Sequence, residues 1–297
     1  QKGGALYFNK GINDEESNNN NSITITNTTF KNNTADYFGG AIYSDFEGLY
    51  VADINNVDFI SNRAYSGGAI YTSYNKNKTL FNVFNEKIKY ENNSSESHGN
   101  DYALSPYLIN LIKGTPPEII IKSGNSFPLE FNLKDQFNQY VNDISRYYSN
   151  IVLNANIENM DNYTNIEYNV LGNTCYFSDG KCELKELSIF SNVYQDIDNI
   201  KLNLTVENNI NNNIKINVNK LKILIEKCEV NQIIMYDNHG FYHCEDPICY
   251  SFCPVDDTAV CEKSKINNIN NPKLNTCKCI DGWIGDLCNK KEYVHIR

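Results

Sequence analysis

A five-residue phrase recurs three times near the start of the chain, and it constrains the fold more than any other feature. Its copies are Gly3-Gly4-Ala5-Leu6-Tyr7, Gly39-Gly40-Ala41-Ile42-Tyr43 and Gly67-Gly68-Ala69-Ile70-Tyr71. The copies start 36 and 28 residues apart, because the first glycines stand at positions 3, 39 and 67. Repeats of this period are typical of stacked structural units that bury a shared core between neighbours.

A second phrase precedes two of these copies, as Phe30-Lys31-Asn32-Asn33-Thr34-Ala35 and Phe59-Ile60-Ser61-Asn62-Arg63-Ala64, and a fading copy follows at residues 90–94. Each unit reads as a short strand, an asparagine corner, a Gly-Gly turn and another short strand, without helical periodicity. This pattern predicts a coiled solenoid of strands. The coil would align equivalent residues as a stack of Phe30 and Phe59, a ladder of Asn32 and Asn62, and a row of Tyr7, Tyr43 and Tyr71.

These phrases resemble the Gly-Gly-Ala-Ile and Phe-x-x-Asn repeats of chlamydial polymorphic outer-membrane proteins and related right-handed parallel β-helix proteins. The resemblance covers about residues 1 to 105 and implies surface display or adhesion. Because the chain begins inside a repeat, we expect a truncated parallel β-helix, with further coils before Gln1. The aligned Tyr7, Tyr43 and Tyr71 form a candidate ligand-binding row on which sugar rings could stack, or they pack within the coils.

The middle of the chain predicts a β-sandwich. Proline-rich punctuation near residues 114–117 marks a boundary, and strand-length segments follow at 119–122, 127–133, 151–155, 184–190, 200–206 and 221–225. Residues 134–141 resemble a phrase found in immunoglobulin-like domains of surface proteins. The Asp179-Gly180 turn signal lies between Cys175 and Cys182, so we predict a short-range disulfide that clamps a hairpin.

Eight of the ten cysteines crowd between positions 228 and 288, which indicates disulfides and an oxidising compartment. The segment from Cys277 to Cys288, with its Gly282-Trp283 step, resembles the closing half of an EGF-like module, and this resemblance implies a Cys279–Cys288 bridge. The sequence leaves the pairing of six cysteines open: Cys228, Cys244, Cys249, Cys253, Cys261 and Cys277. Zinc held by Cys249 and Cys253 near His239 and His243 is the alternative to disulfides, and we favour disulfides.

The predicted fold class is therefore all-β, in three modules and a tail. We assign residues 1–112 to parallel β-helix repeats, 113–227 to an immunoglobulin-like β-sandwich, 228–289 to the cysteine-rich EGF-like module, and 290–297 to the tail. Asn-x-Ser/Thr sequons are possible glycosylation sites and occur at Asn20, Asn27, Asn32, Asn77, Asn92, Asn93, Asn162 and Asn203.

The sequence predicts a binding protein instead of an enzyme. The net charge of −10 disfavours nucleic acid, and none of the common catalytic motifs occurs. We expect no catalytic residues, no metal and no cofactor. The predicted function is an extracellular or cell-surface adhesion protein with a carbohydrate or protein partner. Two alternatives remain: the ectodomain of a membrane receptor attached through a segment outside this chain, and a pectin-lyase-like protein that binds or acts on polysaccharide.

Overall fold

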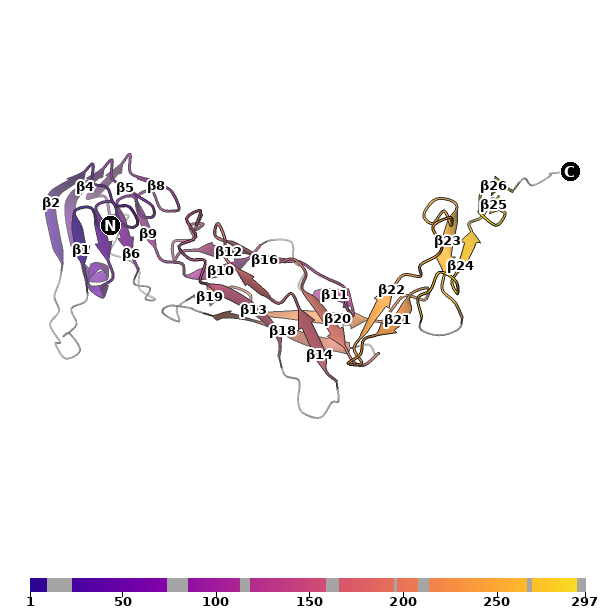
Figure 1. Ribbon diagram of the computed structural model, residues 1–297. Helices are drawn as coiled ribbons and strands as arrows, with labels where there is room; N and C mark the ends of the chain where they lie inside the picture. Colours follow the sequence, from indigo (N-terminus) through magenta and orange to yellow (C-terminus); the bar gives the residue numbers. More distant parts are fainter. Residues whose placement is uncertain are drawn as a thin grey trace.

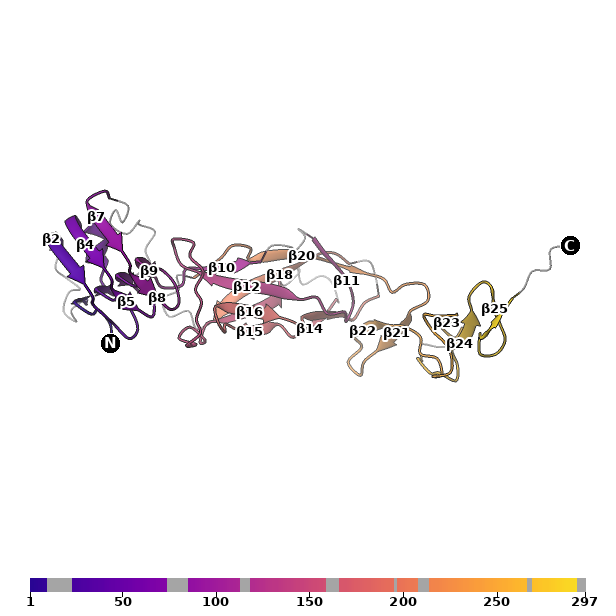
Figure 2. The ribbon, with the colours of Figure 1, turned by 90° about the horizontal axis from the view of Figure 1, so that it is seen from above.

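The computed structural model describes residues 1–9, 23–73, 85–112, 118–158, 166–194, 197–207, 214–265 and 269–292. Within these ranges the regular elements are β-strands and one 3₁₀ helix, η1 (Glu47–Val51). The described chain is elongated, with residues 1–9 and 269–292 at opposite ends (Figure 1), and the view from above shows the same extended shape (Figure 2). No helix in the described ranges is long and apolar enough to cross a bilayer.

The first hundred residues form three sheets in which every strand pair is parallel. The sheet orders are β1-β3-β6-β9, β2-β4-β7 and β5-β8. The strands are β1 (Leu6–Phe8), β2 (Thr24–Lys31), β3 (Ile42–Ser44), β4 (Asp53–Ile60), β5 (Arg63–Ala64), β6 (Ile70–Thr72), β7 (Ile88–Glu91), β8 (Ser94–Ser95) and β9 (Tyr102–Leu104). Each repeat thus contributes one strand to each long sheet.

The parallel register stacks equivalent side chains from successive repeats. Phe30 lies over Phe59 with ring centroids 5.1 Å apart, and Phe59 lies over Tyr90 at 5.4 Å. The Phe30–Phe59 stack was expected from the second phrase, and Phe59 is fully buried. Because each ring covers the next, the stack forms the inside of this part of the molecule.

The asparagine ladder differs by one residue from the sequence prediction. Asn33, not Asn32, joins it: its backbone N and its Nδ2 donate to Asn62 Oδ1 at 3.0 and 2.8 Å. Asn62 Nδ2 in turn donates to Asn93 Oδ1 at 2.9 Å. Asn32 is exposed and has a φ of 57°. The left-handed corner is occupied by Asn32, Ser61 and Asn92, so the asparagine that follows each of them points inward.

Two glycines in each phrase have different physical roles. Gly39 has a φ of +65°, which disfavours other residues. A Cβ on Gly40 would lie 2.0 Å from the carbonyl oxygen of Gly68 in the next repeat. The first glycine therefore permits the turn, and the second permits close approach of adjacent repeats. In the last copy Asn100 follows Gly99, so the second glycine is missing there.

The middle of the chain has antiparallel and mixed sheets. Their orders are β16-β12-β10-β19, β11-β20-β18-β13-β15 and β14-β17-β22-β21. The strands are β10 (Leu108–Leu111), β11 (Glu118–Lys122), β12 (Leu129–Lys134), β13 (Val152–Ile157), β14 (Tyr168–Leu171), β15 (Thr174–Tyr176), β16 (Lys181–Leu184), β17 (Ser188–Ser191), β18 (Ile197–Glu207), β19 (Lys215–Ile216), β20 (Lys220–Glu226), β21 (Ile233–Tyr236) and β22 (Tyr242–Glu245).

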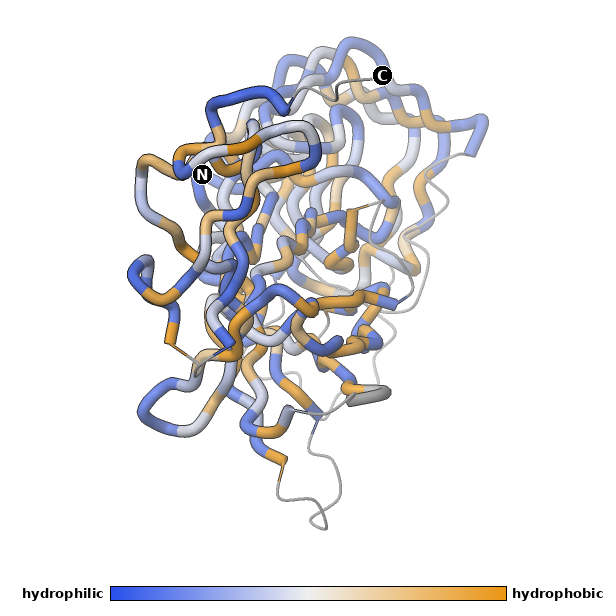
Figure 3. The backbone as a smooth tube through the Cα atoms, turned by 90° about the vertical axis from the view of Figure 1, so that its right-hand side faces the viewer, coloured by the Kyte–Doolittle hydropathy of each residue, from blue (hydrophilic) through white to orange (hydrophobic). Residues whose placement is uncertain are grey.

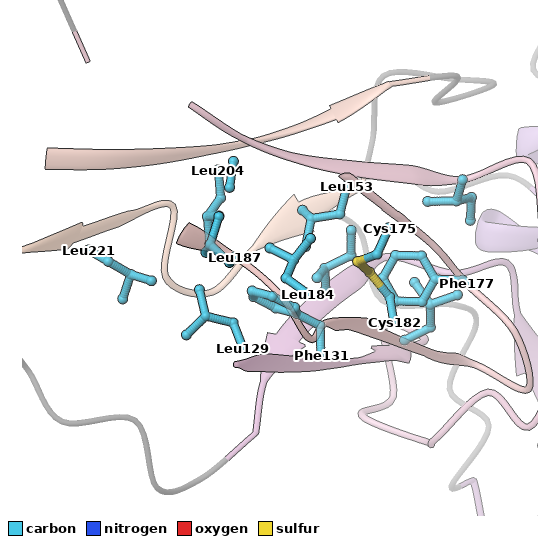
Figure 4. Close-up of a cluster of buried hydrophobic side chains, with 14 of the residues drawn as sticks. Leu129, Phe131, Leu153, Cys175, Phe177, Cys182, Leu184, Leu187, Leu204 and Leu221 are labelled. Carbon is cyan, nitrogen blue, oxygen red and sulfur yellow. A yellow bond between two sulfur atoms is a disulfide. The ribbon is translucent and has the colours of Figure 1, made fainter. Parts of the chain in front are cut away.

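These sheets share one apolar core. Figure 4 shows Leu129 and Phe131 of β12 near Leu153 of β13, with Phe177 beside them. Alternate residues of β12 point inward, because Leu129, Phe131 and Leu133 are buried and Glu130 is exposed. The hydropathy colouring in Figure 3 shows short hydrophobic and hydrophilic stretches that alternate along the described chain.

The Cys175–Cys182 disulfide connects two sheets and does not clamp a two-stranded hairpin. Cys175 lies in β15, which pairs with β13, whereas Cys182 lies in β16, which pairs with β12. Asp179 and Gly180 have φ values of 52° and 66°, so the predicted turn is present between the two cysteines. The chain crosses here from one sheet to the other, and Figure 4 shows the bridge in the core.

The C-terminal part contains two small antiparallel sheets, β23-β24 and β25-β26. Their strands are β23 (Ala259–Glu262), β24 (Thr276–Cys279), β25 (Trp283–Ile284) and β26 (Lys290–Lys291). We expected the boundary between the sandwich and the cysteine-rich module at residue 228, which lies before β21 and β22. However, Ser191 of β17, on the sandwich side, pairs with Tyr242 of β22, on the other side. One sheet therefore spans that position, and the division into domains stays a prediction.

Candidate binding surface

The three repeat tyrosines lie in register, as their spacing predicted. Tyr7 pairs with Tyr43 across β1 and β3, and Tyr43 pairs with Tyr71 across β3 and β6. Their rings stack with centroid separations of 5.1 Å and 5.9 Å. The row exists because parallel strands place equivalent residues one above another.

Two of these three rings are buried and cannot contact a ligand. Tyr7 is 48% exposed, but Tyr43 and Tyr71 are only 2% and 1% exposed. Phe38 stacks on Tyr71 with centroids 4.3 Å apart. The structure therefore corrects the idea of a solvent-facing sugar-binding row, because a sugar ring cannot reach Tyr43 or Tyr71.

A loop of the middle region covers the Tyr71 end of the row. The hydroxyl groups of Tyr71 and Tyr148 are hydrogen-bonded at 2.8 Å, and Tyr65 Oη donates to Asp143 Oδ1 at 2.8 Å. Asp143 is buried, and its carboxylate also accepts the backbone N–H groups of Tyr147 and Tyr148. Burial raises the pKa of Tyr71 and Tyr148 well above that of a free tyrosine, so both stay protonated donors.

A second contact joins the last repeat to the middle region. Asp135 Oδ2 accepts the backbone N–H of Leu104 at 3.3 Å, and Gln139 Nε2 donates to the carbonyl of Tyr102 at 3.1 Å. Burial raises the pKa of Asp135 to about 6, although backbone hydrogen bonds from Gln139, Leu104 and Phe137 work in the opposite direction. Together with the Asp143 contacts, this loop fixes the middle region against the repeats.

We give the name tyrosine rim to three exposed tyrosines at this junction whose neighbours include the aromatic row or Phe38: Tyr7, Tyr37 and Tyr147. Their exposed fractions are 48%, 49% and 45%. Tyr37 and Tyr147 lie 6.2 Å apart by ring centroid, and both rings contact Phe38. Tyrosines present large contact area at low cost in conformational entropy, so the rim is a candidate surface for a macromolecular partner.

Sequence analysis identified Tyr7 but missed Tyr37, Phe38, Asp143 and Tyr147. Phe38 occupies a position that holds Lys2 in the preceding repeat and Ser66 in the following one. It therefore belongs to no repeated phrase. Asp143 and Tyr147 lie more than 70 residues from their partners in the repeats, and only the folded chain brings them there.

The described cysteines form five disulfides, and none of these cysteines is free. They join Cys175 to Cys182, Cys228 to Cys244, Cys249 to Cys261, Cys253 to Cys277, and Cys279 to Cys288. The zinc alternative is inconsistent with this pairing, because the sulfur atoms of Cys249 and Cys253 are both in disulfides. Within the described ranges no group of three or more metal-ligating side chains is assembled.

The sequons have different environments. Asn20, Asn77 and Asn162 lie outside the described residues. Asn27, Asn32 and Asn92 are exposed, and Asn203 is half-buried on β18. Asn93 is the exception, because it is 8% exposed and its Nδ2 donates to the carbonyl of Phe59 and to Asp101 Oδ1. The structure thus contradicts Asn93 as a glycan acceptor, since a glycan on that nitrogen would break the asparagine ladder.

A comparison with protein families finds one match, within the repeats. Residues 27–45 and 56–73 match the family model of the Chlamydia polymorphic membrane protein repeat. These two segments contain Phe30, Asn33, Phe59 and Asn62, which build the stack and the ladder. No curated protein matches the chain. The repeat match indicates a protein associated with the cell surface or outer membrane.

Proposed function

We propose that this chain is a non-catalytic adhesion protein of the cell surface, which holds a protein-binding surface away from the membrane or wall. The observation that carries the proposal is the junction between the repeats and the middle region. Its core is a buried set of hydrogen bonds around Asp143 and Tyr148. A fixed junction turns successive modules into a stiff spacer, which is useful for display and unnecessary for catalysis.

Three finer assignments belong to this proposal. The all-parallel repeats support a parallel β-helix, and the shared core of the middle sheets supports an immunoglobulin-like sandwich. The Cys279–Cys288 bridge is the one that the EGF-like resemblance implies. Interleaved bridges at Cys249–Cys261 and Cys253–Cys277 precede it and are compatible with that resemblance.

The tyrosine rim is the proposed contact surface. Tyr7 lies over the end of the aromatic row, and Tyr37 and Tyr147 flank Phe38. Lys2 Nζ lies 4.9 Å from the centroid of the Tyr43 ring, which adds a positive charge beside the aromatic surface. An exposed aromatic surface fits a protein partner, because tyrosine is among the residues that dominate the energetics of many protein interfaces.

The test is adhesion of beads coated with the full chain to a panel of cells and immobilised matrix proteins. The rim variant carries Tyr7→Ser and Tyr37→Ser, and the matched control carries Tyr176→Ser and Tyr236→Ser. The control removes two tyrosines of similar exposure, 66% and 50%, at a distance from the rim. We expect at least a tenfold loss of adhesion in the rim variant alone. Equal adhesion of both variants, or no adhesion of the original chain, would contradict the proposal.

A further inference from the structure

Two exposed asparagines stand at equivalent corners of the repeats, and each begins a sequon that the proposed function does not use. The sequons are Asn32-Asn33-Thr34 and Asn92-Asn93-Ser94. Asn32 follows the last residue of β2, and Asn92 follows the last residue of β7. Their φ values are 57° and 52°, so both adopt the left-handed conformation in which the chain turns. The two side chains are therefore exposed where these strands end.

The amide nitrogen atoms at these two corners are available for a covalent modification. Among the described residues, the side chains of Asn32 and Asn92 make no hydrogen bond. Asn93 is the opposite case, because its Nδ2 donates to the carbonyl oxygen of Phe59 and to Asp101 Oδ1, both at 3.0 Å. An N-linked saccharide is attached through the amide nitrogen, so the two exposed asparagines can carry one without the loss of a contact.

A third corner separates the two acceptor corners. The parallel register of β2, β4 and β7 makes Asn32, Ser61 and Asn92 equivalent in three consecutive repeats. Ser61 has the same left-handed conformation, with a φ of 54°, but it has no amide side chain. Neighbouring strands lie about 4.8 Å apart, so Asn32 and Asn92 are about 10 Å apart. Two bulky groups therefore fit on this column of corners without occupying adjacent positions.

We propose that Asn32 and Asn92 are N-glycosylated and form a glycan-bearing edge of the repeats. The reaction joins the asparagine Nδ2 to the anomeric carbon of a saccharide. The bond from this carbon to a lipid-linked pyrophosphate breaks, and the pyrophosphate leaves as the amide loses one proton. A secretory compartment supplies such a donor, so the inference rests on the proposed cell-surface function. The pairing of the described cysteines in disulfides supports passage through an oxidising compartment.

The overlapping sequons at residues 92–95 give the sharpest consequence. Asn92-Asn93-Ser94 and Asn93-Ser94-Ser95 both have the acceptor pattern, so the sequence alone does not choose between them. A saccharide on Asn93 would occupy the nitrogen that donates both hydrogen bonds, on a residue that is only 8% exposed. A chain modified there cannot close the asparagine ladder and leaves buried acceptors unpaired. Folded molecules therefore carry the saccharide on Asn92.

The modified edge and the tyrosine rim belong to different sheets. Asn32 and Asn92 follow strands of the β2-β4-β7 sheet, whereas Tyr7 lies in β1 of the β1-β3-β6-β9 sheet. Tyr37 precedes the Gly-Gly turn that leads into β3 of that second sheet. Saccharides on the corners would therefore cover one edge of the repeats and leave the aromatic side open to a partner.

The test is a map of glycan occupancy on the full chain recovered from the surface of the cells that produce it. Enzymatic release of N-glycans in heavy-oxygen water converts each modified asparagine into labelled aspartate, which peptide mass spectrometry locates. Ser94→Ala removes the Asn92 sequon and keeps the Asn93 sequon, and Ser95→Ala does the reverse. Both serines belong to β8, so the two variants are matched controls for each other.

We expect label at Asn32 and Asn92, and at least tenfold less label at Asn93. Ser94→Ala should abolish the label at residues 92 and 93, whereas Ser95→Ala should keep it at Asn92. Missing label at Asn32 or Asn92, or as much label at Asn93 as at Asn92, would overturn the inference. The original chain decides this outcome even if a variant does not fold. Bead adhesion by a chain without glycans would leave the proposed function standing, so the two failures are distinguishable.

Discussion

Replacing Asn62 by alanine tests whether the asparagine ladder holds the repeats together. Asn62 is fully buried, and its side chain makes four hydrogen bonds. Asn62→Ala would leave the backbone N–H of Asn33 and the carbonyl of Phe30 without these partners. Asn93 Oδ1 keeps the bond from the backbone N–H of residue 62. At about 1 to 3 kcal/mol for each orphaned group, we expect a loss of about 4 kcal/mol.

Hydrogen exchange measured by mass spectrometry would locate this loss. A decrease of about 4 kcal/mol corresponds to about a thousandfold faster exchange in β2, β4 and β7, if exchange follows local opening. Fluorescence of Trp283, the single tryptophan, reports the disulfide-rich part separately and should not change.

The matched control is Asn32→Gly, which removes an exposed amide from the neighbouring corner. Glycine tolerates the φ of 57° at this position, so the change in stability should stay within about 1 kcal/mol. If Asn32→Gly slowed or accelerated exchange as much as Asn62→Ala, or if Asn62→Ala had no effect, the one-residue register of the ladder would be refuted.

Three further predictions concern packing, covalent links and pH. Gly68→Ala places a Cβ 2.1 Å from the carbonyl oxygen of Asn100, so the repeats should be destabilised by about 1 to 3 kcal/mol in urea unfolding followed by circular dichroism; an unchanged midpoint would contradict the close approach. Replacing both Cys175 and Cys182 by serine opens a short loop and should cost about 2 to 3 kcal/mol in the same assay, whereas a cost near zero would mean that the bridge between the sheets is dispensable. Burial lowers the pKa of His98 from 6.5 to about 4, although its hydrogen bond to the Leu104 carbonyl works in the opposite direction. The unfolded chain therefore binds more protons in this range, and stability from His98 is lost as pH falls from about 6.5 to about 4, by up to about 3 kcal/mol. Asp135 has the opposite slope because its pKa is raised, so the effect is measured as the difference between the original chain and His98→Gln, and two parallel pH profiles would refute it.

Much of the local structure follows from short-range patterns. The alternation of Phe127, Leu129, Phe131 and Leu133 predicted a strand with one buried face, and β12 has that face in the core. The repeated phrases predicted the Phe30–Phe59 stack and the register of the tyrosine row, because both depend only on equivalent positions in consecutive repeats. The first member of the ladder was predicted one residue too early, although Asn33 and Asn62 each stand three residues after a stacked phenylalanine.

The sequence by itself determined the periodicity of the repeats, the inward face of the strands and the wealth of disulfides. These features are set by glycine conformation, strand geometry and thiol chemistry, which act over a few residues or are visible as composition. Only the tertiary structure decided that Tyr43 and Tyr71 are covered, because Phe38, which belongs to no repeated phrase, stacks on both rings, and Tyr148, 77 positions after Tyr71, bonds to the Tyr71 hydroxyl group.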